Sequence, residues 1–133
     1  MIQKVRVITT IGPDIKGEGV LFDLKKIGNK NITKVVTIKV YRLEGINVLE
    51  AKLLAERLFA EPINQTFTIN KPIISSNIPL VEIAYKPGVM NPESSSIEKS
   101  ATDLGLKLIA CDSSFEYAFF GKVSKEEVLR VIN

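Results

Sequence analysis

Apolar residues in the first third of the chain change from strand-like to helix-like spacing and back. Residues 4–9 alternate in polarity, which predicts a strand with one strongly apolar face. From Gly19 the apolar residues recur at helical spacing, and Gly28 can supply a left-handed C-terminal cap. Residues 33–44 are rich in Val, Ile, Thr and Tyr, which favours two short strands that meet near residues 37–39, or one bent strand.

A second helix is expected to begin at Asn47, because this side chain can cap free amides and Glu50 completes a capping box. Pro62 ends it, since proline lacks an amide proton and clashes with the preceding turn. The buried stripe of this helix is expected to consist of Ala51, Leu54, Ala55 and Leu58. A last strand over residues 63–69 presents three apolar residues on one face, namely Ile63, Phe67 and Ile69.

The second half of the chain shows the same order of elements. Residues 80–85 predict a strand, and a helix begins near Pro92 with Ile97, Ala101 and Leu104 on its buried face and Gly105 as its cap. Two strands, 108–111 and 115–120, are expected to meet at an intervening turn, and a capping box at Ser124 opens another helix. This order matches the first half at a shift of about 77 residues, with a one-residue gap or two.

Two copies of a strand–helix–strand–strand–helix unit fit this pattern best. The first copy covers residues 1–70, a linker covers 71–79, and the second copy covers 80–133. By the repeat shift, the second copy lacks roughly 13 residues of the unit, which are the end of its last helix and a final strand. Either the chain is cut from a longer polypeptide, which we favour, or a partner covers the gap.

Composition and charge narrow the classes of function. The chain has 45% apolar and 25% charged residues and a net charge of +3, without a run of Lys or Arg. These values are ordinary for a soluble protein and give little support to binding of nucleic acid or of a membrane surface. Cys111 is the only cysteine, so no internal disulfide can form and a cytoplasmic location is expected.

The absence of histidine limits the chemistry further. It excludes Ser–His and Cys–His nucleophilic pairs and removes the commonest ligand of transition metals. Cys111 is therefore interpreted as a small buried residue. The glycine-rich segment 12–19 lacks the Gly-Lys-Ser/Thr ending of a phosphate-binding Walker loop, and no close carboxylate pair suggests acid–base catalysis.

Residues 85–105 resemble the hallmark of the small structural subunit of phosphoribosylformylglycinamidine synthase. In that family a strand leads into a Lys-x-Gly-Val-x-[Asp/Asn]-Pro turn and then into a helix that ends in Leu-Gly. Residues 41–45 and 54–63 are similar to the segment found where this module is fused, in two copies, ahead of the catalytic domains. The turn at residues 11–17 departs from the Lys-Pro-Gly-Val pattern, and Asn91 stands where Asp is usual.

The resemblance implies an α+β fold of two ferredoxin-like βαββα(β) repeats, with antiparallel sheets backed by helices. It also implies the fourth step of purine synthesis, in which ATP and glutamine convert formylglycinamide ribonucleotide to its amidine. In that family ATP, Mg and the glutaminase cysteine belong to other domains or subunits, so no cofactor and no catalytic residue are expected here. The expected partners are the synthetase and glutaminase parts, between which the module helps to shape an ammonia passage. A homo-oligomer is a further association to consider.

The candidate docking residues lie in the segments that carry the resemblance, and they are Tyr41, Arg42, Lys86, Pro87, Gly88, Asn91 and Pro92. The turn that contains Lys86 could instead cradle an anion, or it could simply join a strand to a helix. Two other functions remain open. One is a regulatory module that holds a small molecule between the copies, and the other is an RNA-binding sheet on which Tyr41 and Tyr117 stack bases.

Overall fold

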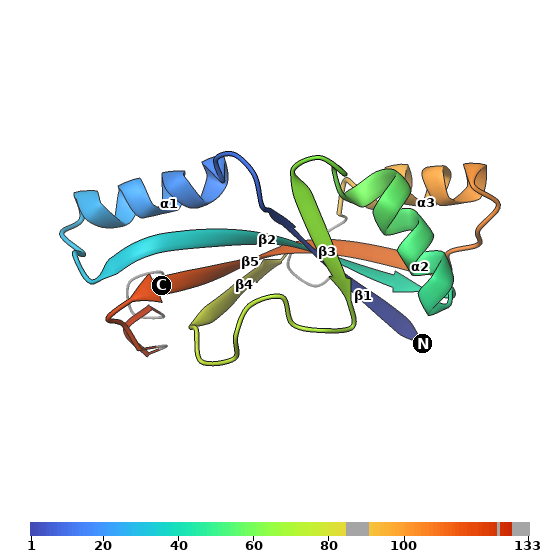
Figure 1. The fold of residues 1–133 in the computed structure, drawn as a ribbon. Helices are drawn as coiled ribbons and strands as arrows, with labels where there is room; N and C mark the ends of the chain where they lie inside the picture. Colours follow the sequence, from blue (N-terminus) through green and yellow to red (C-terminus); the bar gives the residue numbers. More distant parts are fainter. Residues whose placement is uncertain (85–90, 125, 129–133) are drawn as a thin grey trace.

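In the computed structural model, five antiparallel strands form one sheet in the order β3-β1-β2-β5-β4 (Figure 1). The structure describes residues 1–84, 91–124 and 126–128. The strands are β1 (Ile2–Thr9), β2 (Ile32–Glu44), β3 (Gln65–Ile69), β4 (Leu80–Ala84) and β5 (Ala110–Gly121). The resemblance implied antiparallel sheets for two repeats, whereas in the structure strands from both predicted repeats share this one sheet.

The helices lie on one face of the sheet (Figure 1). They are α1 (Ile15–Lys26), α2 (Val48–Leu54), which continues as the π-helical turn η1 (Ala55–Phe59), and α3 (Ser94–Asp103). Within the described part of the chain, no helix has the length and apolar character needed to cross a lipid bilayer.

The two long central strands settle two predictions. β2 is a single strand, which confirms the one-strand alternative for residues 33–44. The turn predicted between two strands at 112–114 is wrong, because β5 runs through these residues and pairs them with β2. The polar triplet there looked like a turn, but Ser113 and Ser114 are buried in the sheet and their hydroxyl groups form hydrogen bonds.

The pairing of the strands repeats itself across the sheet. Lys4 lies opposite Arg42 in the β1–β2 ladder, and a shift of 76 residues turns this pair into Leu80 opposite Ala118 in the β4–β5 ladder. In the central β2–β5 ladder, Lys39 lies opposite Phe115. Phe115 is also the residue that corresponds to Lys39 at the shift of 76 residues. β1 and β2 therefore correspond to β4 and β5 about an axis that passes between these two residues.

Capping residues explain where the helices begin and end. α1 starts before Gly19, because the Asp14 carboxylate accepts a backbone N–H of the first turn. Gly28 and Gly105, both predicted as left-handed caps, have φ angles of 92° and 81°, which confirms that prediction.

Three predicted apolar positions are more exposed than expected. Leu58 is 43% exposed, whereas the adjacent Phe59 is 9% exposed, because the wider π turn of η1 rotates the next residue toward the core. Leu104 is 37% exposed because it follows the last turn of α3. Ile63 is 85% exposed and precedes β3, which is shorter than the predicted strand.

Within the described residues, three hydrophobic cores stabilise the sheet. The first helix-side core lies beneath α2, η1 and α3 and contains Val5, Val7, Leu43, Ile46, Ala51, Leu54, Ala55, Phe59, Ile97, Ala101 and Leu106. The second helix-side core lies beneath α1 and contains Leu24, Ile32, Val35, Tyr117, Phe119 and Val128.

The third core lies on the opposite face of the sheet. It contains Ile38, Val40 and Ala118, against which Ile73, Ile74 and Ile78 pack. The chain crosses this face because β3 and β4 occupy opposite edges of the sheet, as Figure 1 shows for the connection between them.

Candidate functional site

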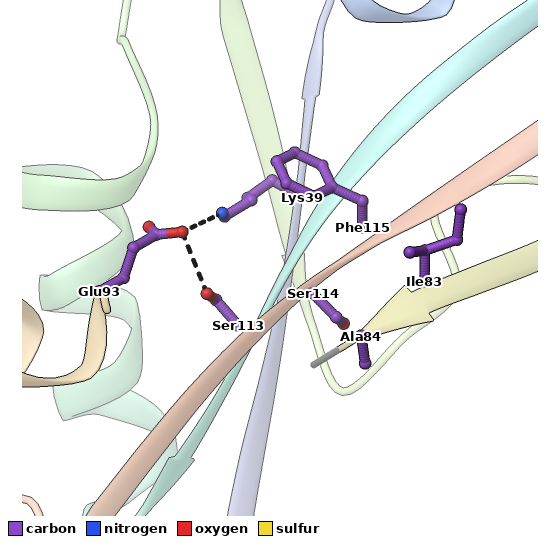
Figure 2. A pocket seen from close by; sticks show the side chains of 7 residues that line it. All are labelled: Lys39, Ile83, Ala84, Glu93, Ser113, Ser114 and Phe115. Carbon is purple, nitrogen blue, oxygen red and sulfur yellow. Dashed lines mark hydrogen bonds and ion pairs between the residues drawn. The ribbon is translucent and has the colours of Figure 1, made fainter. Parts of the chain in front are cut away.

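A pocket of about 220 Å³ lies where the two halves of the sheet meet (Figure 2). Its floor is the central pair Lys39 and Phe115, which β2 and β5 contribute. β4 forms one wall, and Glu93, just before α3, forms another. Among the described residues, the lining consists of Lys39, Ile83, Ala84, Glu93, Ser113, Ser114 and Phe115.

The charged groups of the pocket are paired with one another. Glu93 Oε1 accepts hydrogen bonds from Lys39 Nζ at 2.5 Å and from Ser113 Oγ at 3.2 Å (Figure 2). The Lys39 ammonium also lies 4.2 Å from the centroid of the Phe115 ring, and Lys16 Nζ lies 4.0 Å from the same centroid. Each ammonium group lies close enough to the ring for a favourable cation–π contact. The pocket thus holds a fixed ion pair.

Tyr41 lies beside this pocket and serves mainly in packing. Its ring stacks on Phe59 with centroids 3.9 Å apart and planes 7° apart. Burial, followed by the negative charge of Glu93, raises the pKa of the Tyr41 phenol to about 12, so the phenol is neutral at physiological pH. Tyr117 is 7% exposed in the second helix-side core. With one ring stacked and the other buried, this placement disfavours stacking of RNA bases on the two tyrosines.

Arg42 lies on the opposite face of the sheet, because neighbouring residues of a strand point to opposite sides. Its guanidinium donates to the Glu82 carboxylate and, at 3.1 Å, to Ser114 Oγ. Burial alone would raise the pKa of Glu82, but hydrogen bonds from Ser114 and Arg42 and the positive charges nearby outweigh it and lower this pKa. Arg42 is therefore a half-buried, paired cation, and it is separated from Tyr41 by the sheet itself.

Asn91 joins the start of α3 to the central strands. Its Nδ2 donates to Asp112 Oδ1 at 3.0 Å and to the carbonyl oxygen of Ser113 at 3.0 Å, while its Oδ1 accepts from the Glu93 amide at 2.9 Å. At 7% exposure, this amide group is used within the chain and holds Glu93 in place beside Lys39.

Sequence reasoning missed that Asp14 plays the matching role in the first half. Its Oδ1 accepts from the Gly17 amide at 2.9 Å and its Oδ2 accepts from the Thr37 amide at 2.6 Å. Thr37 is the counterpart of Ser113 at the 76-residue shift. A sequence signal was present, since a short polar residue beside a proline occurs in both turns, as Pro13-Asp14 and as Asn91-Pro92.

The structure brings only some of the predicted docking residues together. Tyr41 and Pro92 line a second pocket of about 320 Å³, which shares Glu93 with the first. Asn91 immediately precedes Pro92 in the chain and is bound to Glu93 through its amide. Arg42 is on the far face, and Lys86, Pro87 and Gly88 lie outside the described residues. The central Lys39–Glu93 pair was not predicted, because no local pattern shows that residues 54 positions apart meet.

Cys111 is half-buried, and its Sγ donates to the carbonyl oxygen of Ser94 at 3.3 Å. Burial, together with the charge of Glu98, raises the pKa of this thiol. A raised pKa disfavours the nucleophilic thiolate, in agreement with a packing role. No group of three or more acidic or cysteine side chains within residues 1–84, 91–124 and 126–128 could hold a metal ion.

A scan of the chain against protein-family models finds no match, and a search among curated proteins finds no significant relative.

Proposed function

We propose that this chain is a non-catalytic docking module built from two ferredoxin-like repeats. In this proposal it organises the synthetase and glutaminase parts of phosphoribosylformylglycinamidine synthase and helps to shape the ammonia passage between them. The observation that carries the proposal is the 76-residue correspondence of the strand pairing about Lys39 and Phe115. A duplicated unit is what the resemblance of residues 85–105 and 41–63 requires.

The chemistry of the central pocket supports a docking role. Its strongest polar groups, Lys39, Glu93 and Ser113, are bound to one another. A general base or nucleophile must instead be available to a substrate. The raised pKa of the Cys111 thiol and the absence of histidine from the chain point the same way.

Reconstitution of the enzyme tests this function. Synthetase and glutaminase preparations that lack the module should form the amidine slowly from glutamine, and addition of the chain should restore this rate. With ammonia supplied directly, the rate should not change, because docking matters only for the transfer from glutaminase to synthetase. An equal effect on both rates, or turnover by the isolated chain, would refute the proposal.

Surface variants localise the docking. Pro92 is exposed beside the second pocket, so Pro92→Glu should weaken restoration of the glutamine-dependent rate. Ile27 is 69% exposed at the C-terminal cap of α1 and does not line that pocket, so Ile27→Glu is the matched control that should restore normally.

The pocket where the halves meet also favours a second candidate, a regulatory module that binds a small molecule. Its volume of about 220 Å³ is below the usual range of drug-sized sites, so an amino acid fits better than a nucleotide. Thermal unfolding with amino acids and with purine nucleotides tests this, since a ligand at 100 times its dissociation constant adds roughly 2.7 kcal/mol of stability. Unchanged unfolding with all of them eliminates this candidate.

A further inference from the structure

The outer edges of the corresponding strands β1 and β4 differ. β3 pairs with the outer edge of β1, and it lies antiparallel to that strand. In the part of the chain that the structure describes, β4 is the last strand of the sheet, and no segment pairs with its outer edge. An unpaired edge presents free N–H and C=O groups and can accept another strand.

Residues of β1 are more buried than their counterparts on β4, because β3 lies beside β1 and α2 and η1 pack over it. Val7 lies opposite Phe67 of β3 and is 3% exposed, whereas its counterpart Ile83 on β4 is 51% exposed. Val5 lies opposite Ile69 and is fully buried, while its counterpart Val81 is half-buried. A strand beside β4 with apolar residues at these two positions would cover a surface that is already apolar.

The side chain at this position carries the opposite charge in the two halves, and in each half it is paired within the chain. Arg6 lies across from Thr68 of β3, and the counterpart of Arg6 is Glu82. Glu82 Oε2 accepts the hydrogen bonds from Arg42 and Ser114, whereas Oε1 accepts none from the described residues. A strand that pairs with this edge therefore meets the 37% exposed carboxylate of Glu82, which is already paired with Arg42 through Oε2 but whose Oε1 a basic residue can complement.

We propose that the outer edge of β4 binds an extended segment of a partner protein by antiparallel strand addition. The segment carries apolar side chains opposite Val81 and Ile83 and a lysine or arginine opposite Glu82. Backbone hydrogen bonds supply affinity, and the alternating side chains supply specificity. The proposal uses the correspondence between the two halves of the sheet and does not depend on the assignment to the synthase.

Labelled peptides that imitate β3 test the proposal. A peptide with the sequence of residues 61–70 and the change Thr68→Lys places lysine opposite Glu82 when it binds in the register of β3. Fluorescence anisotropy should show binding about fivefold tighter than for the Thr68→Glu peptide, as expected for one exposed ion pair. Phe67→Ala in either peptide should weaken binding, because Phe67 would cover Ile83.

Variants of the chain show whether the peptide binds at β4. Ile83→Lys should abolish binding without unfolding the chain, since this side chain is already 51% exposed. Ile109→Lys is the matched control just before β5, where 75% exposure also tolerates the change, and it should bind normally. Absence of binding, equal binding of the two charged peptides, or binding that survives Ile83→Lys would overturn the proposal. A dimer seen by sedimentation and dissociated by Ile83→Lys would also overturn it, because a second copy would then occupy the edge.

Discussion

The two ends of the helix-covered face are built on corresponding strands, but they are covered to different extents. At one end β3, α2, η1 and α3 enclose the first helix-side core. At the other end α1 encloses the second helix-side core, and Ile83 on β4 is half-exposed. Similar strand patterns therefore give unequal burial, because burial depends on which elements lie beside the strands.

The helices of the two ends also approach the sheet differently. A Cβ atom added to Gly17 of α1 would lie 2.3 Å from the carbonyl oxygen of Val35. At the corresponding place, Ser94 of α3 donates its hydroxyl hydrogen bond to the carbonyl oxygen of Cys111 at 3.0 Å. The carbonyl groups of Val35 and Cys111 occupy corresponding positions in β2 and β5. The helix packs closely against the first, whereas a serine hydroxyl group donates a hydrogen bond to the second.

The largest effect should come from truncation in the better covered core. Phe59→Ala removes a ring that is 9% exposed and stacked on Tyr41, so it should lower the free energy of unfolding by about 3–5 kcal/mol. Leu58→Ala, the neighbouring change at 43% exposure, should cost less than about 1 kcal/mol. Urea unfolding of both variants checks this. Equal losses of unfolding free energy would contradict the π turn of η1, which points Phe59 rather than Leu58 into the core.

The two helix contacts should respond unequally to small changes. Gly17→Ala forces α1 away from Val35 and should cost about 1–3 kcal/mol, as overpacking of a tight contact does. Ser94→Ala removes one hydrogen bond and should cost about 1 kcal/mol. Chemical denaturation measures both losses; a Gly17→Ala variant as stable as the wild type would show that α1 does not pack this closely.

The turns before α1 and α3 use opposite hydrogen-bonding chemistry. Asn91→Asp replaces a donor with a carboxylate facing Asp112 Oδ1 and the Ser113 carbonyl oxygen, and it should cost about 1–3 kcal/mol at neutral pH. Asp14→Asn should also destabilise, because one of two acceptor oxygens is lost. Thermal unfolding compares these variants with Asn29→Asp, a change outside either turn. If Asn91→Asp unfolds like the wild type, the hydrogen bonds of Asn91 are not those described.

The smallest differences should appear at alkaline pH. Burial, followed by Glu93, raises the pKa of Tyr41 from 10.0 to about 12, and burial, followed by Asp14, raises that of Tyr117. A folded-state pKa above the unfolded value gives stability that is present below pH 10 and is lost as the pH rises toward about 12. The slope of unfolding free energy against pH in this range should be shallower in Tyr41→Phe, and a slope equal to that of the wild type would contradict the pKa shift.

The helices and most strands could be predicted from local patterns, because capping residues, glycines and apolar spacing act over a few residues. Asn47 and Glu50 form the predicted capping box, and Gly28 and Gly105 have left-handed backbones. The turn predicted at Ser113 and Ser114 is wrong, because their hydroxyl groups form hydrogen bonds with Asn91 and Glu82, which are distant in the sequence. No local pattern shows that these partners are available in a strand. The Leu58 prediction was wrong because a π turn leaves no clear local signal.

The candidate site was harder to predict from the sequence than the helices and strands, because it depends on contacts between residues that are far apart in the chain. Tyr41, Asn91 and Pro92 could be selected from the sequence, and they lie near one another around Glu93. The pairing of Lys39 with Glu93 and the merger of both predicted repeats into one sheet are set by the register of β2 and β5. A one-residue slip in that register would place Lys39 on the other face, and composition and spacing do not fix it.

Amide hydrogen exchange in β1 and β4 tests the central comparison most directly. β1 has a paired strand on both sides, so its consecutive amides from Val5 to Val7 should all exchange slowly. In β4 only the amides that face β5 are paired, so slow and fast exchange should alternate from Val81 to Ala84. Uniformly slow exchange along β4, equal to that in β1, would contradict the account of one covered and one open half.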